Sequence, residues 1–349
     1  MQPEGSSART SADASVLRDV LARYGIVAST ITPIPAGRMN RHWRVEAADG
    51  AVYALRRYTP ERSPAAIAFE HGVIEDISRR GWPVAAPLGS DDGATFVSIG
   101  GQRYALFPFL GGQPGPPYSA AHLRTKGRLL ARLHRDLASS PARDQREGWG
   151  RIWESDVTAP IGRFASFNDA LLAFGGEHPD LASAIRRYRY RSLRELARLG
   201  YGDLPDTLIH FDFHNDNLLF DGGVLSALLD FDSVHFDARA ADIACSVAND
   251  CPEPPADIAT SADAAAAFVG GYVAHTPLED RELRLIVPLL RAYRLSGLPR
   301  TMRAWSDGRH DEVFPRLKRL LEQRLPALDT NGAQIEAAVM RAAHAVRHH

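Results

Sequence analysis

Short stretches rich in apolar and β-branched residues, separated by turns, recur in the first hundred positions. A helical pattern at 16–24 is followed by stretches rich in Ile, Val, Thr and aromatic residues, with Asp49-Gly50 as a typical hairpin turn. The predicted strands are 26–35, 42–47, 51–58 and a further hairpin at about 84–106. Ser63 and Pro64 supply an N-cap and a first-turn proline for a helix that runs to about residue 80. This region is therefore expected to be a small antiparallel sheet with one main helix.

The remaining two thirds of the chain read mainly as helix. Apolar residues spaced at i, i+3 and i+4 predict helices at 120–139, 180–199, 262–274, 279–297 and 311–324. The exception is 207–236, where two short apolar runs flank a polar loop. The stretch 107–117 holds four prolines and three glycines and reads as a linker. We therefore expect an α+β protein with a disordered tail (1–15), an N-terminal lobe (16–106), this linker and a C-terminal lobe (118–349).

Composition narrows the class of protein. Of 349 residues, 45% are hydrophobic and 24% are charged, which excludes wholesale disorder and fibrous structures. No apolar run approaches the roughly 18 residues of a membrane helix, and the polar opening lacks the apolar core of a signal peptide. Cys245 and Cys251 are too few for a disulfide framework. We expect a soluble cytoplasmic protein without a membrane or nucleic acid partner; the sequence does not indicate its oligomeric state.

The net charge of −1 hides an asymmetry. Residues 1–200 hold 27 Lys and Arg against 20 Asp and Glu, whereas residues 201–349 hold 14 against 22. An acidic half can hold metal ions or a cationic ligand, although unevenly distributed surface charge would give the same count. Only Lys126 and Lys318 are lysines, beside 39 arginines, which limits the residues able to do a lysine's work.

The strongest chemical signal lies at 208–232. Phosphoryl transfer needs a carboxylate that orients and accepts the proton of the attacking hydroxyl, and oxygen ligands that hold Mg²⁺. Asp212, Asn217 and Asp230 supply that set, because the first two share one loop and the third follows the next apolar run. The kinase catalytic-loop pattern has the same Asp-to-Asn spacing.

These residues resemble those of a known family. The matching motifs are His210-Phe211-Asp212-x-x-x-x-Asn217, Leu229-Asp230-Phe231 and Asp242-Ile243-Ala244. They are similar to the aminoglycoside phosphotransferase, choline kinase and homoserine kinase type II superfamily, which has a two-lobed protein kinase-like fold. The resemblance covers roughly 16–325 and is closest to homoserine kinase type II in the C-terminal half. It implies Asp212 as catalytic base, Asn217 and Asp230 as Mg²⁺ ligands, His210 as a structural loop member and Asp242 as a hydrogen-bonding brace.

The N-terminal half departs from the family at the phosphate-binding lysine. The chain has Ala54-Leu55-Arg56 where kinases carry Ala-x-Lys. The resemblance implies that Ala54 lies under the adenine and that Arg56 clamps phosphate, with Glu70 as its partner and Glu61 and Glu75 as rivals. It also implies nucleotide contacts from the hairpin residues Gly37 and Asn40 and from the hinge residues Phe107 and Phe109. Alternatively Arg56 is an ordinary surface arginine, or marks an inactive pseudokinase.

Other assignments remain open. If His210, Asp212 and His214 alternate along a strand, they could form a metallohydrolase site. Asp232, Asp216 and His214 are candidate substrate contacts, and His134 reads as a buried structural histidine.

The function expected from these residues and this resemblance is ATP- and Mg²⁺-dependent phosphorylation of a hydroxyl group. The acceptor would be a small polar metabolite, because only eleven residues separate Asp230 from Asp242, too few for an activation loop. The acidic C-terminal half suits an amine-bearing acceptor such as an aminoglycoside-type antibiotic or a specialised metabolite. A homoserine kinase-type amino alcohol kinase is the alternative.

Overall fold

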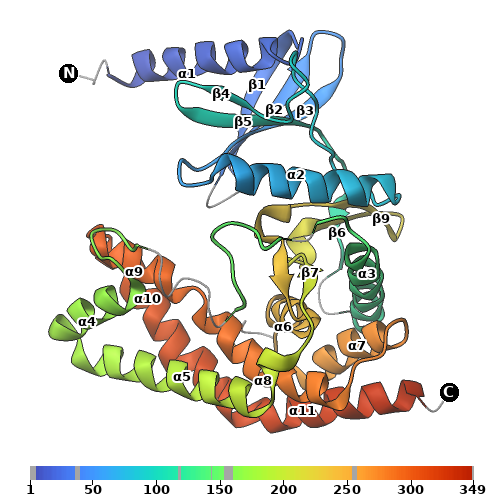
Figure 1. Cartoon of the computed structure of the whole chain (residues 1–349), viewed down its shortest axis with the longest axis vertical. Coiled ribbons are helices and arrows are strands. Elements are labelled where there is room, and N and C mark those ends of the chain that lie inside the picture. Colours follow the sequence, from blue (N-terminus) through green and yellow to red (C-terminus); the bar gives the residue numbers. More distant parts are fainter. Residues whose placement is uncertain are drawn as a thin grey trace. The chain divides into compact units, whose positions relative to one another are not determined.

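The chain divides into two compact units. The computed structural model describes residues 5–35, 40–116, 119–142, 144–152, 160–253 and 258–347 (Figure 1). The first unit comprises residues 1–113 and 219–229, and the second comprises 114–218 and 230–349. Strands and helices mix in the first unit, whereas helices dominate the second, which gives the expected α+β class.

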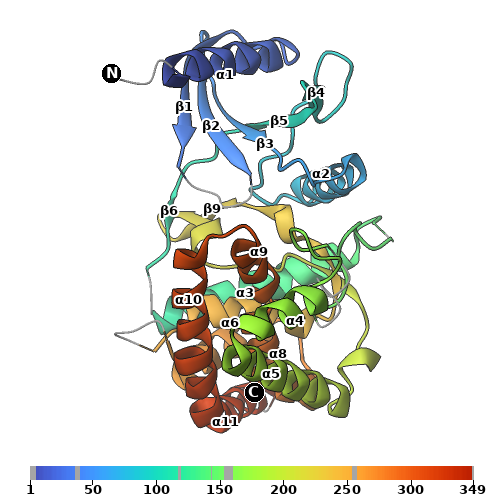
Figure 2. The ribbon, with the colours of Figure 1, turned by 90° about the vertical axis from the view of Figure 1, so that its left-hand side faces the viewer.

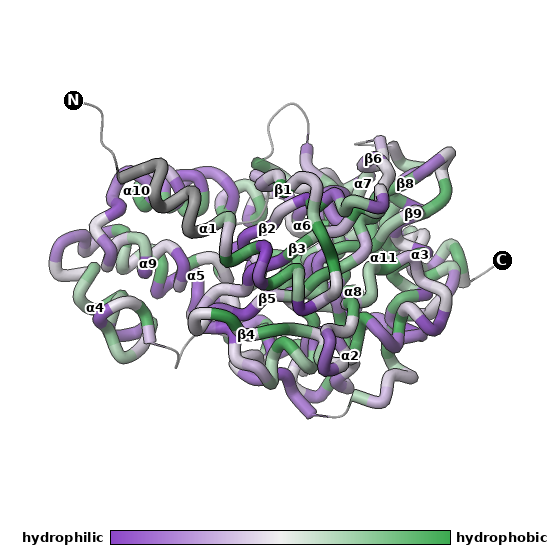
Figure 3. Tube along the Cα trace, turned by 90° about the horizontal axis from the view of Figure 1, so that it is seen from above, coloured by the Kyte–Doolittle hydropathy of each residue, from purple (hydrophilic) through white to green (hydrophobic). Residues whose placement is uncertain are grey.

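A five-stranded antiparallel sheet forms the first unit. Its strands run in the spatial order β1-β2-β3-β5-β4. Their bounds are β1 Ala28–Ile34, β2 Arg41–Ala47, β3 Val52–Arg57, β4 Val97–Ile99 and β5 Gln102–Pro108. The middle of β5 is apolar and buried, and hydrophobic positions show in green along it in Figure 3. The helix α2 (Pro64–Arg79) begins as expected, because the Ser63 side chain caps the backbone N–H of Ala66.

Helix α1 (Gly5–Ala22) closes one hydrophobic core of this unit. Its residues Leu17, Val20 and Leu21 share a face and pack with Val45 and Leu55 of the sheet. The helix begins at Gly5, so the tail expected to be disordered over 1–15 is helical from that residue. The physical reason is that no proline or further glycine interrupts the chain before the end of this helix.

The hairpin expected at 84–106 is shorter than predicted and lies later in the chain. Only β4 and β5 pair, over 97–104, while 84–94 forms no strand. Pro87 lacks a backbone N–H, and Ser90 and Gly93 close a turn with a hydrogen bond of 2.8 Å, so this stretch cannot continue a ladder. The extended stretch is instead fixed by the Leu88 N–H, which donates to the Leu106 carbonyl at 2.8 Å.

A hairpin from the second half of the sequence belongs to the first unit. Strands β8 (Leu218–Asp221) and β9 (Val224–Leu228) pair with the short β6 (Gln113–Pro114) in a separate sheet. The Leu228 N–H donates to the Pro83 carbonyl at 2.8 Å, and the Ser226 hydroxyl donates to Gly111 at 3.0 Å. These contacts are why 219–229 groups with the first unit, whereas the sequence assigned it to the C-terminal lobe.

The second unit consists mainly of helices (Figure 2) and also contains a two-stranded ribbon. The ribbon pairs β7 (Thr207–Ile209) with β10 (His235–Asp237). The helices are α3 Ala120–Ala138, α4 Phe167–Glu177, α5 Pro179–Arg198, α6 Arg239–Asp250, α7 Ala262–Val273, α8 Asp280–Leu295, α9 Leu298–Ser306, α10 His310–Lys318 and α11 Leu325–Arg347. A π-helical segment, Arg319–Arg324, joins the last two. No helix in the described ranges is long and apolar enough to cross a membrane.

Two glycines allow α3 and α7 to approach closely. A Cβ atom on Gly127 would lie 2.0 Å from the Phe268 carbonyl oxygen, and one on Gly271 would lie 2.1 Å from the Arg124 oxygen. Both gaps are far below van der Waals contact, so only glycine fits at either side of the crossing. This contact positions α3, whose residues Lys126 and His134 reach the polar loop described next.

Candidate active site

The loop after β7 is held by one buried carboxylate. Asp242, in the first turns of α6, accepts hydrogen bonds from the backbone N–H groups of His210 at 2.9 Å and Phe211 at 3.0 Å. The Asp242 side chain is fully buried, and its Oδ2 lies 3.0 Å from His134 Nε2. The other ring nitrogen of His134, Nδ1, lies 2.9 Å from the Tyr272 hydroxyl. His134 is thus a buried structural histidine, and Asp242 has the bracing contacts expected of it.

Phe211 adopts a backbone conformation that side chains rarely take. Its φ is +58°, and in the described part of the chain only Asp230 among the other non-glycine residues has a positive φ. The Asp242 bond to its N–H and the Cys245 thiol on its carbonyl, at 3.2 Å, fix that conformation. The ring contacts those of His235 and Tyr293 edge to face, at 5.1 and 5.8 Å.

Asp212 is the central polar group of this loop. Its Oδ2 accepts from Asn217 Nδ2 at 2.8 Å, and its Oδ1 lies 3.1 Å from His214 Nε2. Burial by itself would raise the pKa of this carboxyl, but the hydrogen bonds and positive charge of His214, with help from Asn217, lower its pKa below the usual value. The same pair raises the pKa of His214 against the opposing effect of burial. Asp212 is therefore an ionised, oriented carboxylate at neutral pH.

Asn217 and Asp230 offer oxygen ligands suited to a hard divalent cation. Asn217 donates through Nδ2 to both the carbonyl and the carboxylate of Asp212, so its amide oxygen is the atom left for a metal ion. Asp230 follows β9, and its Oδ1 also accepts from the Asp232 N–H at 3.3 Å. One amide and one carboxylate oxygen, supplemented by phosphate oxygens and water, fit the chemistry of Mg²⁺. In the described ranges, no group of three or more His, Cys, Asp and Glu side chains is arranged to hold a metal without such additional ligands.

A buried arginine supports the backbone next to Asp230. Arg146 is 1% exposed, and its Nη1 donates to the carbonyls of Asp232 at 2.7 Å and Val234 at 3.3 Å. The sequence did not single it out, since one arginine among 39 carries no signal. Its guanidinium fixes the segment in which Asp230 has its unusual backbone conformation.

A second buried ion pair fixes the other end of the loop. Lys126 on α3, 1% exposed, bonds the carboxylate of Asp250, which also accepts from the Asn215 N–H at 2.9 Å. Burial lowers the pKa of Lys126, while the Asp250 charge opposes that effect. The scarcity of lysine in the chain was the signal that could have drawn attention to Lys126.

In the first unit, Arg56 pairs with Glu70. Arg56 Nη1 donates to Glu70 Oε1 at 2.7 Å, and its Nε donates to His42 at 3.1 Å. Glu70 is fully buried, whereas Glu61 accepts from the Thr59 hydroxyl. The structure therefore places Glu70 against Arg56, as the sequence predicted. The guanidinium lies 5.2 Å from the Phe107 ring centre, which makes Arg56 an anchored, half-buried cation rather than a free surface arginine.

The other residues expected near the nucleotide have mixed environments. Ala54 pairs with Phe107 across the β3–β5 ladder. Phe107 is 5% exposed and packs on His71, so its ring is core, whereas Phe109 is 41% exposed. Asn40 is buried, and its Oδ1 accepts from the Thr59 N–H at 3.2 Å. Gly37 lies outside the described residues.

The strand assumed for a metallohydrolase site is absent from the described structure of this loop. β7 ends at Ile209, and the His210 ring is buried, where its Nδ1 accepts from the Asp212 N–H at 3.3 Å. His210, Asp212 and His214 therefore do not alternate along a strand, and that premise was wrong. Among the candidate substrate contacts, the Asp216 side chain is 88% exposed and His214 is paired with Asp212, while Asp232 is half-buried.

Comparison with known sequences identifies the family. A sequence profile of the phosphotransferase enzyme family matches residues 30–281. The homoserine kinase of Methylobacterium radiotolerans is 29% identical over 282 residues, which cover 80% of this chain and 83% of the relative. The homoserine kinase of Caulobacter sp. is 30% identical over 258 residues, which cover 74% of this chain and 75% of the relative.

Solved structures share the fold. An amicoumacin kinase in complex with AMP-PNP, Ca²⁺ and Ami has a TM-score of 0.69 at 18% identity and covers 88% of this chain and 93% of its own. A microcompartment-associated aminopropanol kinase has a TM-score of 0.62 at 17% identity, with coverages of 94% and 99%. These likenesses confirm the kinase-like fold expected from the catalytic-loop motif. By its matched profile, its relatives and its fold, the chain belongs to the phosphotransferase enzyme family and is a small-molecule kinase.

Proposed function

We propose that the chain transfers the γ-phosphoryl group of ATP, with Mg²⁺, to a hydroxyl group on a small amine-bearing metabolite. One observation carries the proposal. Asp212 is held as an ionised carboxylate by Asn217 and His214, in a loop that Asp242 fixes through two backbone hydrogen bonds. A carboxylate oriented in this way can accept the proton of an attacking hydroxyl.

In the proposed reaction, the acceptor oxygen forms a bond to the γ-phosphorus while the bond from that phosphorus to the bridging oxygen of ADP breaks. Asp212 orients the hydroxyl and receives its proton as the O–H bond breaks. Asn217 and Asp230 would hold the metal ion, which when bound neutralises charge on the phosphate groups. His214 holds one carboxylate oxygen of Asp212 in a fixed position, so the carboxylate is already oriented before the acceptor binds.

Arg56 is proposed to bind phosphate in the first unit. Its contact with buried Glu70 leaves a planar guanidinium that is oriented and permanently charged. Guanidinium groups bind phosphate oxygens in pairs, so Arg56 can do the work of the usual lysine with a different geometry. The same contacts argue against a pseudokinase, since an unused arginine would need no buried carboxylate to orient it.

Two kinds of acceptor have support. The acidic balance of residues 201–349 favours a cationic acceptor, such as an aminoglycoside-type antibiotic or a specialised metabolite. Curated relatives named homoserine kinase, such as the two described above, favour homoserine as the second candidate. Both candidates are hydroxyl compounds that carry an amine, so they share the chemistry proposed for Asp212.

The test is a phosphate-transfer screen with ATP and Mg²⁺ against homoserine, choline, ethanolamine, aminopropanol, sugars, nucleosides and aminoglycosides. Asp212→Asn should lower kcat by at least about 10³-fold while leaving ATP affinity within a few-fold, because its loss affects proton transfer and orientation. Asp263→Asn, an exposed acid in the first turn of α7, is the matched control and should retain full activity. Undiminished transfer by Asp212→Asn would overturn the proposal.

A further inference from the structure

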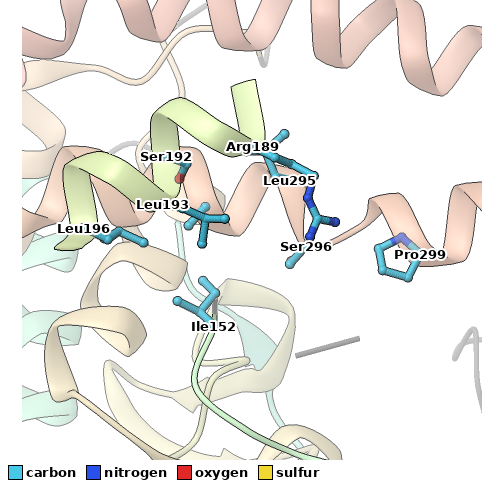
Figure 4. Close-up of a pocket in the computed structure, with 9 residues that line it drawn as sticks. Ile152, Arg189, Ser192, Leu193, Leu196, Leu295, Ser296 and Pro299 are labelled. Carbon is cyan, nitrogen blue, oxygen red and sulfur yellow. The ribbon is translucent and has the colours of Figure 1, made fainter. Parts of the chain in front are cut away.

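A cavity of about 50 Å³ lies in the second unit between α5, α8 and the start of α9 (Figure 4). Most of its lining is apolar. The lining residues are Ile152, Arg189, Ser192, Leu193, Leu196, Ala292, Leu295, Ser296 and Pro299. Figure 4 shows Ile152 on one side and Ser192, Leu193 and Leu196 of α5 on the other. The cavity has room for a short apolar group rather than for a sugar ring or a nucleotide.

Ser192 supplies an unusual polar atom in this apolar surround. The residue is 3% exposed, and its hydroxyl finds no hydrogen-bond partner among the residues that the structure describes. A buried hydroxyl without a partner destabilises a protein, because nothing compensates for the loss of its hydrogen bonds to water. At a cavity wall, a polar atom of a bound molecule could supply the hydrogen bond that this hydroxyl lacks.

Helix α8 connects this cavity to the catalytic loop. Ala292 and Ser296 line the cavity, and Tyr293, between them on the helix, contacts the Phe211 ring at 5.8 Å. Phe211 directly precedes Asp212. Residues at i, i+1 and i+4 on a helix lie within a little more than one turn, about 6 Å along the axis. The cavity therefore lies about one helical turn from an aromatic contact of the catalytic loop.

Phe211 itself points to an apolar acceptor surface. Glycine would adopt its positive φ at no steric cost, whereas a bulky residue there is strained. The ring is half-exposed and packs on Tyr293, and His235 behind it stacks on Trp149 at 4.6 Å. These rings extend an apolar surface from the residue before Asp212 toward α8.

We propose that this cavity binds an apolar arm of the acceptor and that Ser192 hydrogen-bonds a polar atom at the end of that arm. The inference rests on the proposed function, because it requires the acceptor hydroxyl to lie at Asp212. It specifies the acceptor as an amino alcohol with an alkyl arm of several carbons, rather than a compact one such as homoserine. Tyr293 and Phe211 line the path of the arm, and the cavity receives its end.

A chain-length series tests this inference without phosphate transfer. The nucleotide-free protein is titrated calorimetrically with ethanolamine and with N-butyl-, N-hexyl- and N-(6-hydroxyhexyl)ethanolamine. Each buried methylene should tighten binding by about fourfold, so the hexyl compound should bind at least about tenfold more tightly than ethanolamine. The terminal hydroxyl should improve affinity further, and Ser192→Ala should remove only that improvement.

Variants at the cavity separate specific binding from general hydrophobic adsorption. Ser192→Leu fills the cavity and should abolish the increase in affinity with chain length. Leu193→Glu should do the same, and it is less disruptive to the fold because Leu193 is 39% exposed at the rim of the cavity. Leu172→Ser, at a 70% exposed position of α4 outside the cavity, is the control and should keep the gain.

Equal affinity for all four amines, or an undiminished gain in both cavity variants, would overturn the inference. Failure of the proposed function would be distinct, because it would leave phosphate transfer undetected or insensitive to Asp212→Asn whatever the binding results.

Discussion

Removing Lys126 should leave a charge buried without a partner. Lys126 is 1% exposed and the Asp250 side chain is 5% exposed, so water cannot replace the lost ammonium group. Breaking a buried ion pair at one partner destabilises a protein by about 3–5 kcal/mol. In a unit of this size, each kcal/mol lowers Tm by about 2–4 °C, so Lys126→Met should lower Tm by about 6–20 °C.

The double variant separates the buried charge from the lost packing. Lys126→Met with Asp250→Asn removes both charges but keeps an oxygen that can accept from the Asn215 N–H, now bonded at 2.9 Å. Because replacing a buried pair by neutral groups is often close to neutral, the double variant should be more stable than Lys126→Met alone. The magnitude of this rescue measures the charge effect by itself.

Thermal unfolding followed by circular dichroism at pH 7 provides the assay. Lys318→Met, at the other lysine of the chain and exposed on α10, is the control and should change stability by no more than about 0.5 kcal/mol. The reasoning is refuted if Lys126→Met is as mild as this control, or if the double variant is less stable than either single variant.

Three further outcomes are expected. Gly127→Ala should lower the free energy of unfolding in urea by several kcal/mol, because its Cβ would lie 2.0 Å from a carbonyl oxygen. Gly72→Ala in α2, whose Cβ would meet nothing within 4 Å, is the control and should raise the free energy of unfolding by about 0.5–1 kcal/mol. Equal effects of the two substitutions would contradict the close helix crossing. Arg146→Met should raise the Mg²⁺ concentration for half-maximal activity, since it loosens the segment after β9, and an unchanged metal dependence would speak against that role. Arg56→Ala should raise the KM for ATP at least about tenfold, and Arg56→Lys should raise it less. Glu70→Gln should raise the KM about as much as Arg56→Lys does. An unaltered KM in Arg56→Ala would mean that other residues bind the phosphate.

Local patterns were sufficient for most elements of the fold. The helices with one apolar face, such as α3 and α5, lie within a residue or two of their predicted bounds, because half their surface meets water and the periodicity is visible. α6 was missed, and ten of its twelve residues are buried, the polar Asp242, Ser246 and Asp250 among them, so its polar positions do not mark a side that faces water. The stretch at 84–94 was read as strand because apolar content does not reveal whether a partner strand is present.

The candidate site was predictable to a similar degree. The spacing of Asp212, Asn217 and Asp230 predicted a phosphoryl-transfer site, because the kinase catalytic loop has the same Asp-to-Asn spacing. Arg146 and Lys126 belong to no such motif, since their importance comes from burial against the backbone and acidic groups of the site.

The sequence by itself indicated the chemistry that we propose for this protein: a carboxylate, an amide and a second carboxylate at kinase spacing, with an arginine at the position of the usual lysine. It also determined the helices and strands that have one solvent-exposed face, because the alternation of apolar and polar residues along them is visible in the local sequence. Only the tertiary structure decided that Glu70 orients Arg56, that Lys126 and Asp250 fix the loop of Asp212, and that Ser192 lies at a cavity without a hydrogen-bond partner among the described residues. Each of these depends on the desolvation of a polar group by residues distant in sequence, and burial of that kind is a property of the packed chain.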